Sequence, residues 1–332
     1  MTRRKISLAV ASVLALPPMF AQAAGPQVTG PQVVEALEGT FGVHPGVRRN
    51  HTKGTCALGE FTGTAEAAKY SRSALFSGQA VPVVARFSLA GGNPKAPDVA
   101  KSPRGMALQF KLPQGKLHQM AMLNTPMFGA ASPQTFLDLT LAQRPDPATG
   151  KPDPEKLKAF KAAHPDNQAQ AQYLAGHNPP DSYAHSSYFG IHTFQFIGAQ
   201  DKVTPVRWRF VPQGGDKPLS DEALKTAGAD FLEKALIDAT AKQPVRWDML
   251  VSVGQAGDPQ DDPTQPWPAG RLEFKAGTLT IASASAQKGA ACETVNFDPM
   301  VMADGIAPTN DPVLRFRSQA YAVSFGKRLS GQ

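Results

Sequence analysis

Short runs of alternating apolar and polar residues recur along most of this chain, a pattern typical of strands that bury one face. Glycine-marked turns separate the runs, and the pair Gln114 and Gly115 predicts a hairpin turn. Many short strands of this kind favour a closed antiparallel barrel. The predicted strands are the segment after His51 and residues 81–92, 106–112, 120–124, 188–200, 202–212, 246–255 and 271–284.

Apolar residues repeat every three to four positions in other segments, which predicts amphipathic helices. These helices precede the first strand, separate the strands into two groups and end the chain. We therefore expect an α+β protein in which an antiparallel barrel carries helical insertions, and we find no internal repeat. The predicted helices are residues 34–42, 134–143, 154–175, 221–243 and 312–329.

The last helix carries the most unusual side-chain pattern. Asp311 can cap its first free amides, and Pro312 suits its first turn. Arg317, Tyr321 and Arg328 then share one face, because they lie four and seven residues apart. A guanidinium one turn from a phenol favours the phenolate, which is a good ligand for ferric iron. The alternative is an ordinary amphipathic helix with exposed arginines and a packed tyrosine.

Composition and the first residues indicate an exported globular protein. The 332 residues are 42% hydrophobic and 18% charged, and the net charge of +7 is too dispersed to indicate a nucleic-acid surface. Residues 1–23 have the basic start, short apolar core and Ala-Gln-Ala end of a cleaved signal peptide, not of a membrane anchor. We expect a periplasmic protein with a single domain over residues 24–332, and both the general secretory and the twin-arginine routes stay open.

The two cysteines, Cys56 and Cys292, fit no metal-ligand spacing. A disulfide between them is chemically possible in an oxidising compartment. The sequence alone leaves that pairing open, because spacing does not fix geometry.

His51 is the candidate acid–base residue. It lies at the entrance to a predicted strand among the cationic Arg48, Arg49 and Lys53. The hydroxyl of Ser88, on the next strong strand, could orient its imidazole. The alternative is an ordinary surface or core histidine.

Seven motifs occur in an order that resembles the haem catalases. They are RxxHxKG, VARFS, SPRGMALQF, NTPMF, YFGIHTF, FDPMVMADGIAPTNDP and RxxxY with an arginine seven residues later. The resemblance runs from about His44 to Arg328. The wrapping segments and the C-terminal helical domain of full-length catalases have no counterpart, so the chain resembles a catalase-related peroxidase reduced to the barrel and a haem-bearing helix.

The resemblance implies a role for each matching residue. His51 matches the distal histidine, and Ser88 matches the hydroxyl that supports it. Tyr321 matches the tyrosine that ligates haem iron. Arg317 matches the arginine that keeps this tyrosine ionised, backed by Asp311 and His192. The remaining matches are the propionate-binding arginines Arg48, Arg86 and Arg328, and the aromatic neighbours of the macrocycle, Phe128 and Phe136.

Two positions depart from the family pattern. Catalases have two asparagines before Thr-Pro, and the first supplies a distal amide; here the pair is Leu123 and Asn124. Asn124 is therefore the catalytic candidate, since a one-residue strand slip would exchange the facing of both side chains. Asn50 stands where catalases have an apolar residue, and its amide is a second candidate for the missing donor.

The resemblance implies a peroxidase with haem b that reduces hydrogen peroxide or organic peroxides with electrons from a small organic donor, and with weak catalase activity. The alternatives are a haem enzyme that rearranges fatty-acid hydroperoxides and a non-redox periplasmic barrel that binds an apolar ligand. We expect no nucleic-acid or membrane partner, and either a monomer or a small homo-oligomer.

Overall fold

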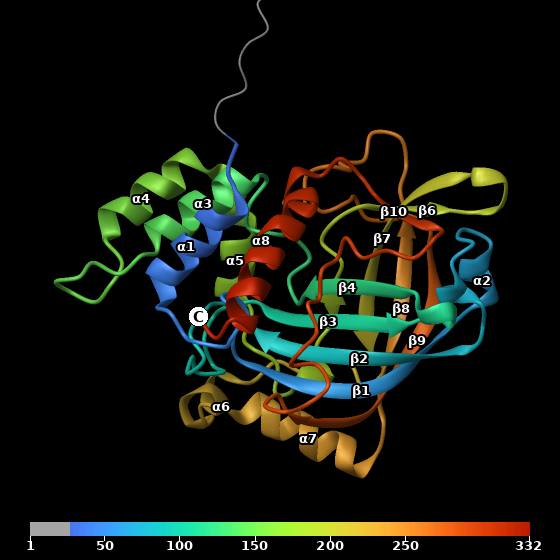
Figure 1. Cartoon of the computed structure of the whole chain (residues 1–332), viewed down its shortest axis with the longest axis horizontal. Coiled ribbons are helices and arrows are strands. Elements are labelled where there is room, and N and C mark those ends of the chain that lie inside the picture. Colours follow the sequence, from blue (N-terminus) through green and yellow to red (C-terminus); the bar gives the residue numbers. More distant parts are fainter. Residues whose placement is uncertain (1–26) are drawn as a thin grey trace, which may run out of the picture.

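Antiparallel strands close into an eight-stranded barrel in the computed structural model, which describes residues 27–332 (Figure 1). The ring follows the order β1-β2-β3-β4-β5-β7-β8-β9, and pairing of β1 with β9 closes it. Two short strands, β6 and β10, extend the sheet beside β7. The bounds are β1 Gly54–Gly63, β2 Ala80–Leu89, β3 Arg104–Lys111, β4 Leu117–Leu123, β5 Tyr188–Phe189, β6 Phe194–Ile197, β7 Val203–Pro212, β8 Val245–Val253, β9 Glu273–Ala286 and β10 Ile306–Pro308.

The barrel interior is filled by large apolar side chains, as the alternating pattern requires. Phe61, Phe87, Phe110 and Phe210 are fully buried in it. Trp247 is equally buried, and its indole N–H donates to a backbone carbonyl at 3.0 Å. Each such ring stabilises the fold by about 1.5–3 kcal/mol relative to an exposed ring. The barrel is therefore a packed core, and its interior is no ligand channel.

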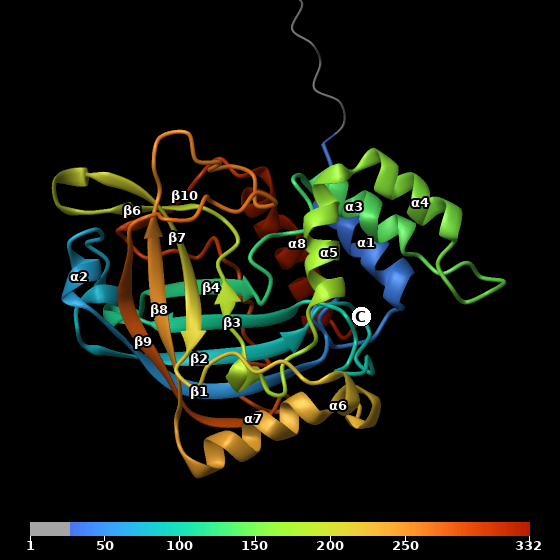
Figure 2. The ribbon, with the colours of Figure 1, turned by 180° about the vertical axis from the view of Figure 1, so that it is seen from behind.

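The helices lie mainly at one end of the barrel. In both views α8 lies between the barrel and the group formed by α1, α3 and α4 (Figures 1 and 2). Helices α6 and α7 lie below the barrel, where α7 packs against β9. The bounds are α1 Gly30–Phe41, α2 Ala65–Ala68, α3 Pro133–Ala142, α4 Pro154–Ala163, α5 Gln168–Gly176, α6 Asp221–Thr226, α7 Phe231–Lys242 and α8 Pro312–Leu329.

Two predicted helices are each broken in two. The prediction over residues 154–175 is wrong at Pro165, because proline lacks the amide that would continue the ladder, and α4 ends at Ala163. The prediction over residues 221–243 is wrong at Ala227 and Gly228, where the chain turns extended before α7 begins. The helix predicted over residues 312–329 is confirmed as α8, with Asp311 as its cap.

Cys56 of β1 and Cys292 form a disulfide, which resolves the alternative that the sequence left open. The predicted signal peptide, residues 1–23, lies outside the described residues. Within residues 27–332, no helix combines the length and apolarity needed to cross a bilayer.

Candidate functional site

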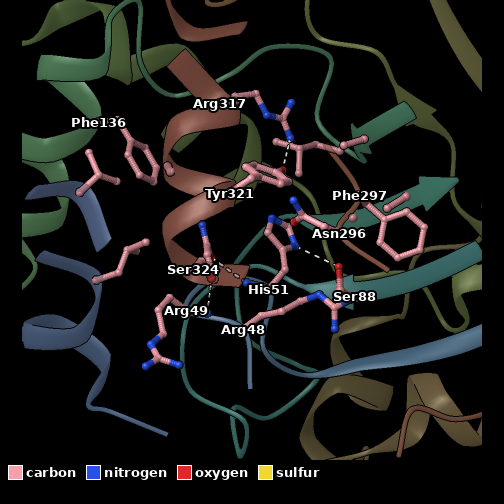
Figure 3. A pocket seen from close by; sticks show the side chains of 18 of the residues that line it. Arg48, Arg49, His51, Ser88, Phe136, Asn296, Phe297, Arg317, Tyr321 and Ser324 are labelled. Atoms are coloured by element: carbon pink, nitrogen blue, oxygen red, sulfur yellow. Dashed lines mark hydrogen bonds between the residues drawn. The ribbon is translucent and has the colours of Figure 1, made fainter. Parts of the chain in front are cut away.

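A pocket lies between the barrel and α8, and α1 and α3 complete its enclosure. Figure 3 shows the two groups of side chains that face into it: Arg317 and Tyr321 from the helix, and His51 and Ser88 from the barrel end. We call the first group the helix wall (Arg317, Tyr321). We call the second group, together with the lining residues Asn50 and Gly105, the loop wall (Asn50, His51, Ser88, Gly105).

The helix wall rests on regular helical spacing. Arg317 and Tyr321 lie one turn apart on α8, and a guanidinium nitrogen of Arg317 donates to the Tyr321 hydroxyl oxygen at 2.5 Å. The guanidinium also lies 5.2 Å from the centre of the tyrosine ring. The pairing predicted from the sequence is therefore present in space.

A buried chain of polar groups supports Arg317 from behind. Its other terminal nitrogen lies 3.3 Å from Nε2 of His192, and Nδ1 of His192 lies 2.6 Å from Asp311. Burial and the nearby Arg317 lower the pKa of His192 although Asp311 opposes this, so Nδ1–H donates to the carboxylate and Nε2 accepts from Arg317. The second oxygen of Asp311 accepts from the first amides of α8 at 2.8 and 3.1 Å. One carboxylate thus caps the helix and fixes its arginine.

On the loop wall, the position of the His51 imidazole depends on an irregular backbone conformation. His51 has a φ of 52°, in the left-handed region, and its Nδ1 lies 3.0 Å from the hydroxyl oxygen of Ser88 on β2. The side-chain oxygen of Asn50 accepts from the His51 amide at 2.8 Å. The orientation of His51 by Ser88 that the sequence predicted is present.

Two glycines in the strands leave room for this arrangement, and the sequence reasoning missed both. A Cβ on Gly105 of β3 would lie 2.9 Å from the Ser88 hydroxyl and 3.0 Å from the His51 ring. A Cβ on Gly54 would lie 2.3 Å from the Arg86 guanidinium. A glycine inside a strand is the signal that could have indicated such a close approach.

Three of the predicted arginines form a cationic cluster in the pocket lining: Arg48, Arg86 and Arg328. Within residues 27–332 no carboxylate lies within ion-pair distance of any of them, whereas the adjacent Arg49 pairs with Glu38 at 2.6 Å. Burial and the two neighbouring guanidiniums lower the pKa of Arg48 to about 8. Burial likewise lowers the pKa of Arg86 to about 10. Uncompensated buried cations of this kind are suited to an anionic ligand.

Backbone carbonyls hold this arginine cluster in place. Arg48 donates to the carbonyls of Cys292 and Val295 at 3.0 and 2.7 Å, and Arg328 donates to that of Glu293 at 2.7 Å. The disulfide ties this carbonyl segment to Cys56 of β1. The cross-link therefore joins the barrel to the segment that orients two of the three arginines.

Apolar side chains form most of the remaining lining. Phe128 and Phe136, both predicted, have their ring centres 5.9 Å apart and their planes inclined by 22°. Leu123, at the end of β4, and Phe297 are buried in the lining. The sequence reasoning missed Phe297, the neighbouring Asn296, and the valines and leucine that α1 contributes.

Asn124 is the predicted site residue that the structure does not bring to the pocket. Its side-chain oxygen accepts from the backbone amide of Arg104 at 2.7 Å, and its backbone amide donates to the Arg104 carbonyl at 2.8 Å. Leu123 lines the pocket instead, so the expected placement is corrected. The physical reason is the register of β4: Leu123 pairs with Gly105 and faces inward, and Asn124 closes the strand end.

The His51 imidazole is neutral at ordinary pH. Burial, and the positive charges of Arg86, Arg317 and Arg48, lower its pKa to about 3. A neutral ring whose Nδ1 faces Ser88 leaves Nε2 free to exchange a proton with a small ligand.

The donor set fits a haem, as the sequence resemblance implies. A tyrosine oxygen is available as a metal ligand, and unpaired guanidiniums are available for two carboxylates. The apolar and aromatic lining suits a flat macrocycle. The pocket thus combines a ligand, an anion-binding cluster and an acid–base group.

Known proteins match this chain over nearly its whole length. The family model described as Catalase matches residues 45–332. The "Catalase-related peroxidase" of Synechococcus elongatus is 60% identical over 304 residues, which cover 92% of this chain and 90% of that protein. The "Catalase-related peroxidase" of Mycolicibacterium paratuberculosis is 35% identical over 90% of this chain and 94% of that protein.

Solved structures match the fold as well. The "Structure of a bacterial catalase" superposes with a TM-score of 0.78 at 26% identity, over 86% of this chain and 58% of that one. A fungal catalase gives a TM-score of 0.79 at 23% identity, over 86% of this chain and 60% of that one. This chain therefore spans somewhat more than half the length of these two catalases.

Proposed function

This chain belongs to the catalase family, and from that membership we propose that its pocket binds haem b and reduces peroxides with electrons from a small organic donor. It is an oxidoreductase that acts on peroxide, as the two catalase-related peroxidases that it resembles indicate. Those relatives favour neither the rearrangement of fatty-acid hydroperoxides nor a non-redox binding barrel.

The observation that carries the proposal is the pairing of two unlike groups across one pocket. The helix wall presents a tyrosine oxygen held by Arg317, and the loop wall presents the neutral imidazole of His51. A ligand and a base are both needed for haem-dependent peroxide chemistry, and neither wall supplies both.

Tyr321 would hold the iron, and the cationic cluster of Arg48, Arg86 and Arg328 would hold the two propionates. Phe128 and Phe136 would pack against the macrocycle. The haem would supply the electron-transfer chemistry.

His51 moves the proton. In the tautomer whose Nδ1–H donates to Ser88, Nε2 accepts the proton of the peroxide O–H and then returns it to the departing oxygen, which leaves as water or an alcohol. The low pKa of His51 keeps this base available, and the cationic surroundings that cause it also favour prompt return of the proton. Ser88 holds the ring so that Nε2, and not Nδ1, faces the pocket.

Leu123, at the end of β4, favours peroxidase over catalase chemistry. Leu123 lines the pocket where an amide would help to hold a second peroxide, and it offers no hydrogen bond. We therefore include weak oxygen evolution in the proposal. Export to the periplasm, a single domain over residues 24–332, and a monomer or small homo-oligomer remain parts of the same proposal.

Reconstitution with haem tests the function. The purified chain should take up one haem, show the visible spectrum of a tyrosine-ligated ferric haem, and oxidise phenolic or dye-like reductants when peroxide is added. A screen of such reductants would identify the donor class. A chain that binds no haem, or binds it without consuming peroxide, would overturn the proposal.

A further inference from the structure

Asn50 carries a pair of contacts that the proposed chemistry does not yet use. Its side-chain oxygen accepts from two backbone amides, those of His51 and Gly91, each at 2.8 Å. Because amide N–H groups only donate, these two bonds fix which end of the Asn50 amide is the oxygen. The NH₂ end is therefore directed away from both backbone groups.

The backbone that Asn50 contacts is unusual. Within the described chain four non-glycine residues have a positive φ, and three of them, Gln114, Gln200 and Asp201, are exposed residues in three-residue 3-10 segments. His51 is the fourth and lines the pocket. A left-handed residue of this kind persists only where its surroundings hold it, and such residues gather at functional sites.

Three side chains hold His51, at its backbone amide, its backbone carbonyl and the Nδ1 of its ring. Asn50 accepts from its amide, Arg86 donates to its carbonyl at 2.6 Å, and Ser88 contacts its Nδ1. The ring contact alone cannot set the position of Nε2, because the ring also moves with the backbone that bears it.

Asn50 also joins this residue to the loop that follows β2. Gly91 donates its amide to Asn50, and its carbonyl accepts from the amide of Thr52 at 3.1 Å. The loop wall is thus tied on both sides of His51 to one glycine.

We propose that Asn50 is a positioning residue for the proposed acid–base residue His51: its side-chain oxygen clamps the left-handed backbone of His51 to Gly91 and so fixes where Nε2 meets the peroxide. This proposal rests on the proposed role of His51. The requirement is for a short side chain with an acceptor oxygen, which asparagine and aspartate share and apolar residues of similar size lack.

The test compares Asn50→Asp, which keeps an acceptor for both amides, with Asn50→Leu, which keeps the size and removes the acceptor. Asn50→Ala serves as a second variant without the acceptor, in case leucine disturbs folding. Asn93→Ala is the matched control, because the Asn93 oxygen also accepts from a backbone amide, at 2.9 Å, but lies exposed and outside the pocket lining.

Two measurements are made on the haem-loaded full chain. Hydrogen exchange at the His51 and Gly91 amides should become about tenfold faster or more in Asn50→Leu and Asn50→Ala, and should stay within about threefold of the unmodified protein in Asn50→Asp and Asn93→Ala. The rate of peroxide consumption should follow the same order, with a loss of about 10–100-fold in the variants without the acceptor, because small misplacements of a catalytic group cost that much.

The proposal would be overturned if Asn50→Leu kept both the slow hydrogen exchange of the His51 and Gly91 amides and the rate of peroxide consumption. It would also be overturned if Asn50→Asp were as impaired as Asn50→Leu. Failure of the proposed function is distinguishable, because the unmodified protein would then consume no peroxide. The exchange measurement would still decide whether Asn50 holds the backbone of His51.

Discussion

The helix wall and the loop wall each bring polar side chains into the same pocket, but the first does so by regular helical spacing and the second by contacts between distant segments. On the helix wall, Arg317 and Tyr321 meet because regular spacing on α8 places them one turn apart. On the loop wall, His51 reaches its place through a left-handed backbone, contacts to three side chains and a glycine that leaves room for its ring. The first wall is local and robust, whereas the second depends on several segments at once.

This difference predicts how each wall fails. A substitution on the helix wall should remove the function of one side chain and leave the rest of the pocket unchanged. On the loop wall, changes in residues that never touch a ligand should also matter, because they move His51.

The largest effect is expected for Tyr321→Phe. Phenylalanine keeps the ring and removes the oxygen that would ligate iron, so haem retention should fall sharply. Absorbance of the haem band after gel filtration measures this. Tyr173→Phe on α5, outside the pocket lining, is the matched control and should retain haem normally. An unchanged haem spectrum in Tyr321→Phe would contradict the assignment of the iron ligand.

His51→Ala should come next in size. Haem should stay bound, because the proposed ligand and the cationic cluster remain, while the reaction with peroxide slows by about 10²–10⁴-fold through loss of the acid–base group. Stopped-flow spectroscopy with hydrogen peroxide measures the rate. His44→Ala, seven residues earlier and outside the pocket lining, should react normally. A His51→Ala rate within a few-fold of the unmodified protein would rule out the role.

The two walls also differ in how far the sequence could predict them. The helix start at Asp311 and the Arg317–Tyr321 spacing are local features, so the helix wall was predictable residue by residue. The barrel was predictable for the same reason, since alternation is a local signal. The breaks at Pro165 and Gly228 were also visible in the sequence, but a strong helical period outweighed them.

The loop wall was predictable only in part. The order of the motifs indicated His51 and Ser88, but the roles of Gly105 and Asn50 depend on contacts between segments far apart in the chain. The same applies to Asn124, whose side chain was displaced from the pocket by one residue of strand register. The disulfide likewise joins residues 236 positions apart, which spacing alone cannot reveal.

Gly105→Ala tests the crowding of the loop wall. The added methyl would meet Ser88 and the His51 ring at 2.9–3.0 Å, so the imidazole must shift by a few tenths of an ångström or more. We expect a loss of about 10–100-fold in peroxide consumption with haem still bound. Gly228→Ala is the matched control, because a Cβ at this position has no neighbour within 4 Å and because the backbone of Gly228 is not left-handed. Equal rates in the two variants would show that the close approach is not needed.

Leu123→Asn should change activity by a smaller factor and in the opposite direction. An amide at this position would add a hydrogen-bond donor to the pocket lining, where it could help to hold a second peroxide. We expect oxygen evolution to rise several-fold, as measured with an oxygen electrode. Leu58→Asn on the exposed face of β1 is the control and should change nothing. No gain in oxygen from Leu123→Asn would show that the missing amide does not limit catalase turnover.

The smallest effect is expected for pH. An ordinary histidine has a pKa near 6.5 and would lose most of its base form by pH 5. Burial, and the positive charges of three guanidiniums, instead lower the pKa of His51 to about 3. These guanidiniums belong to Arg86, Arg317 and Arg48. The base therefore stays neutral above about pH 3, and peroxide consumption should be nearly constant between pH 5 and 7.

The same shift acts on stability with a defined sign. Below about pH 6.5 the unfolded chain binds a proton at His51, whereas the folded chain does not until about pH 3. The contribution of His51 to the free energy of unfolding is therefore fully present above pH 6.5 and is lost as the pH falls towards 3. Denaturant unfolding of the unmodified chain and of His51→Ala across this range measures the contribution. The prediction would be contradicted if the rate of peroxide consumption fell below about pH 6.5 and if the unmodified chain and His51→Ala showed the same pH dependence of unfolding free energy. Those results would show that the imidazole is in free contact with water and that the loop wall does not enclose it.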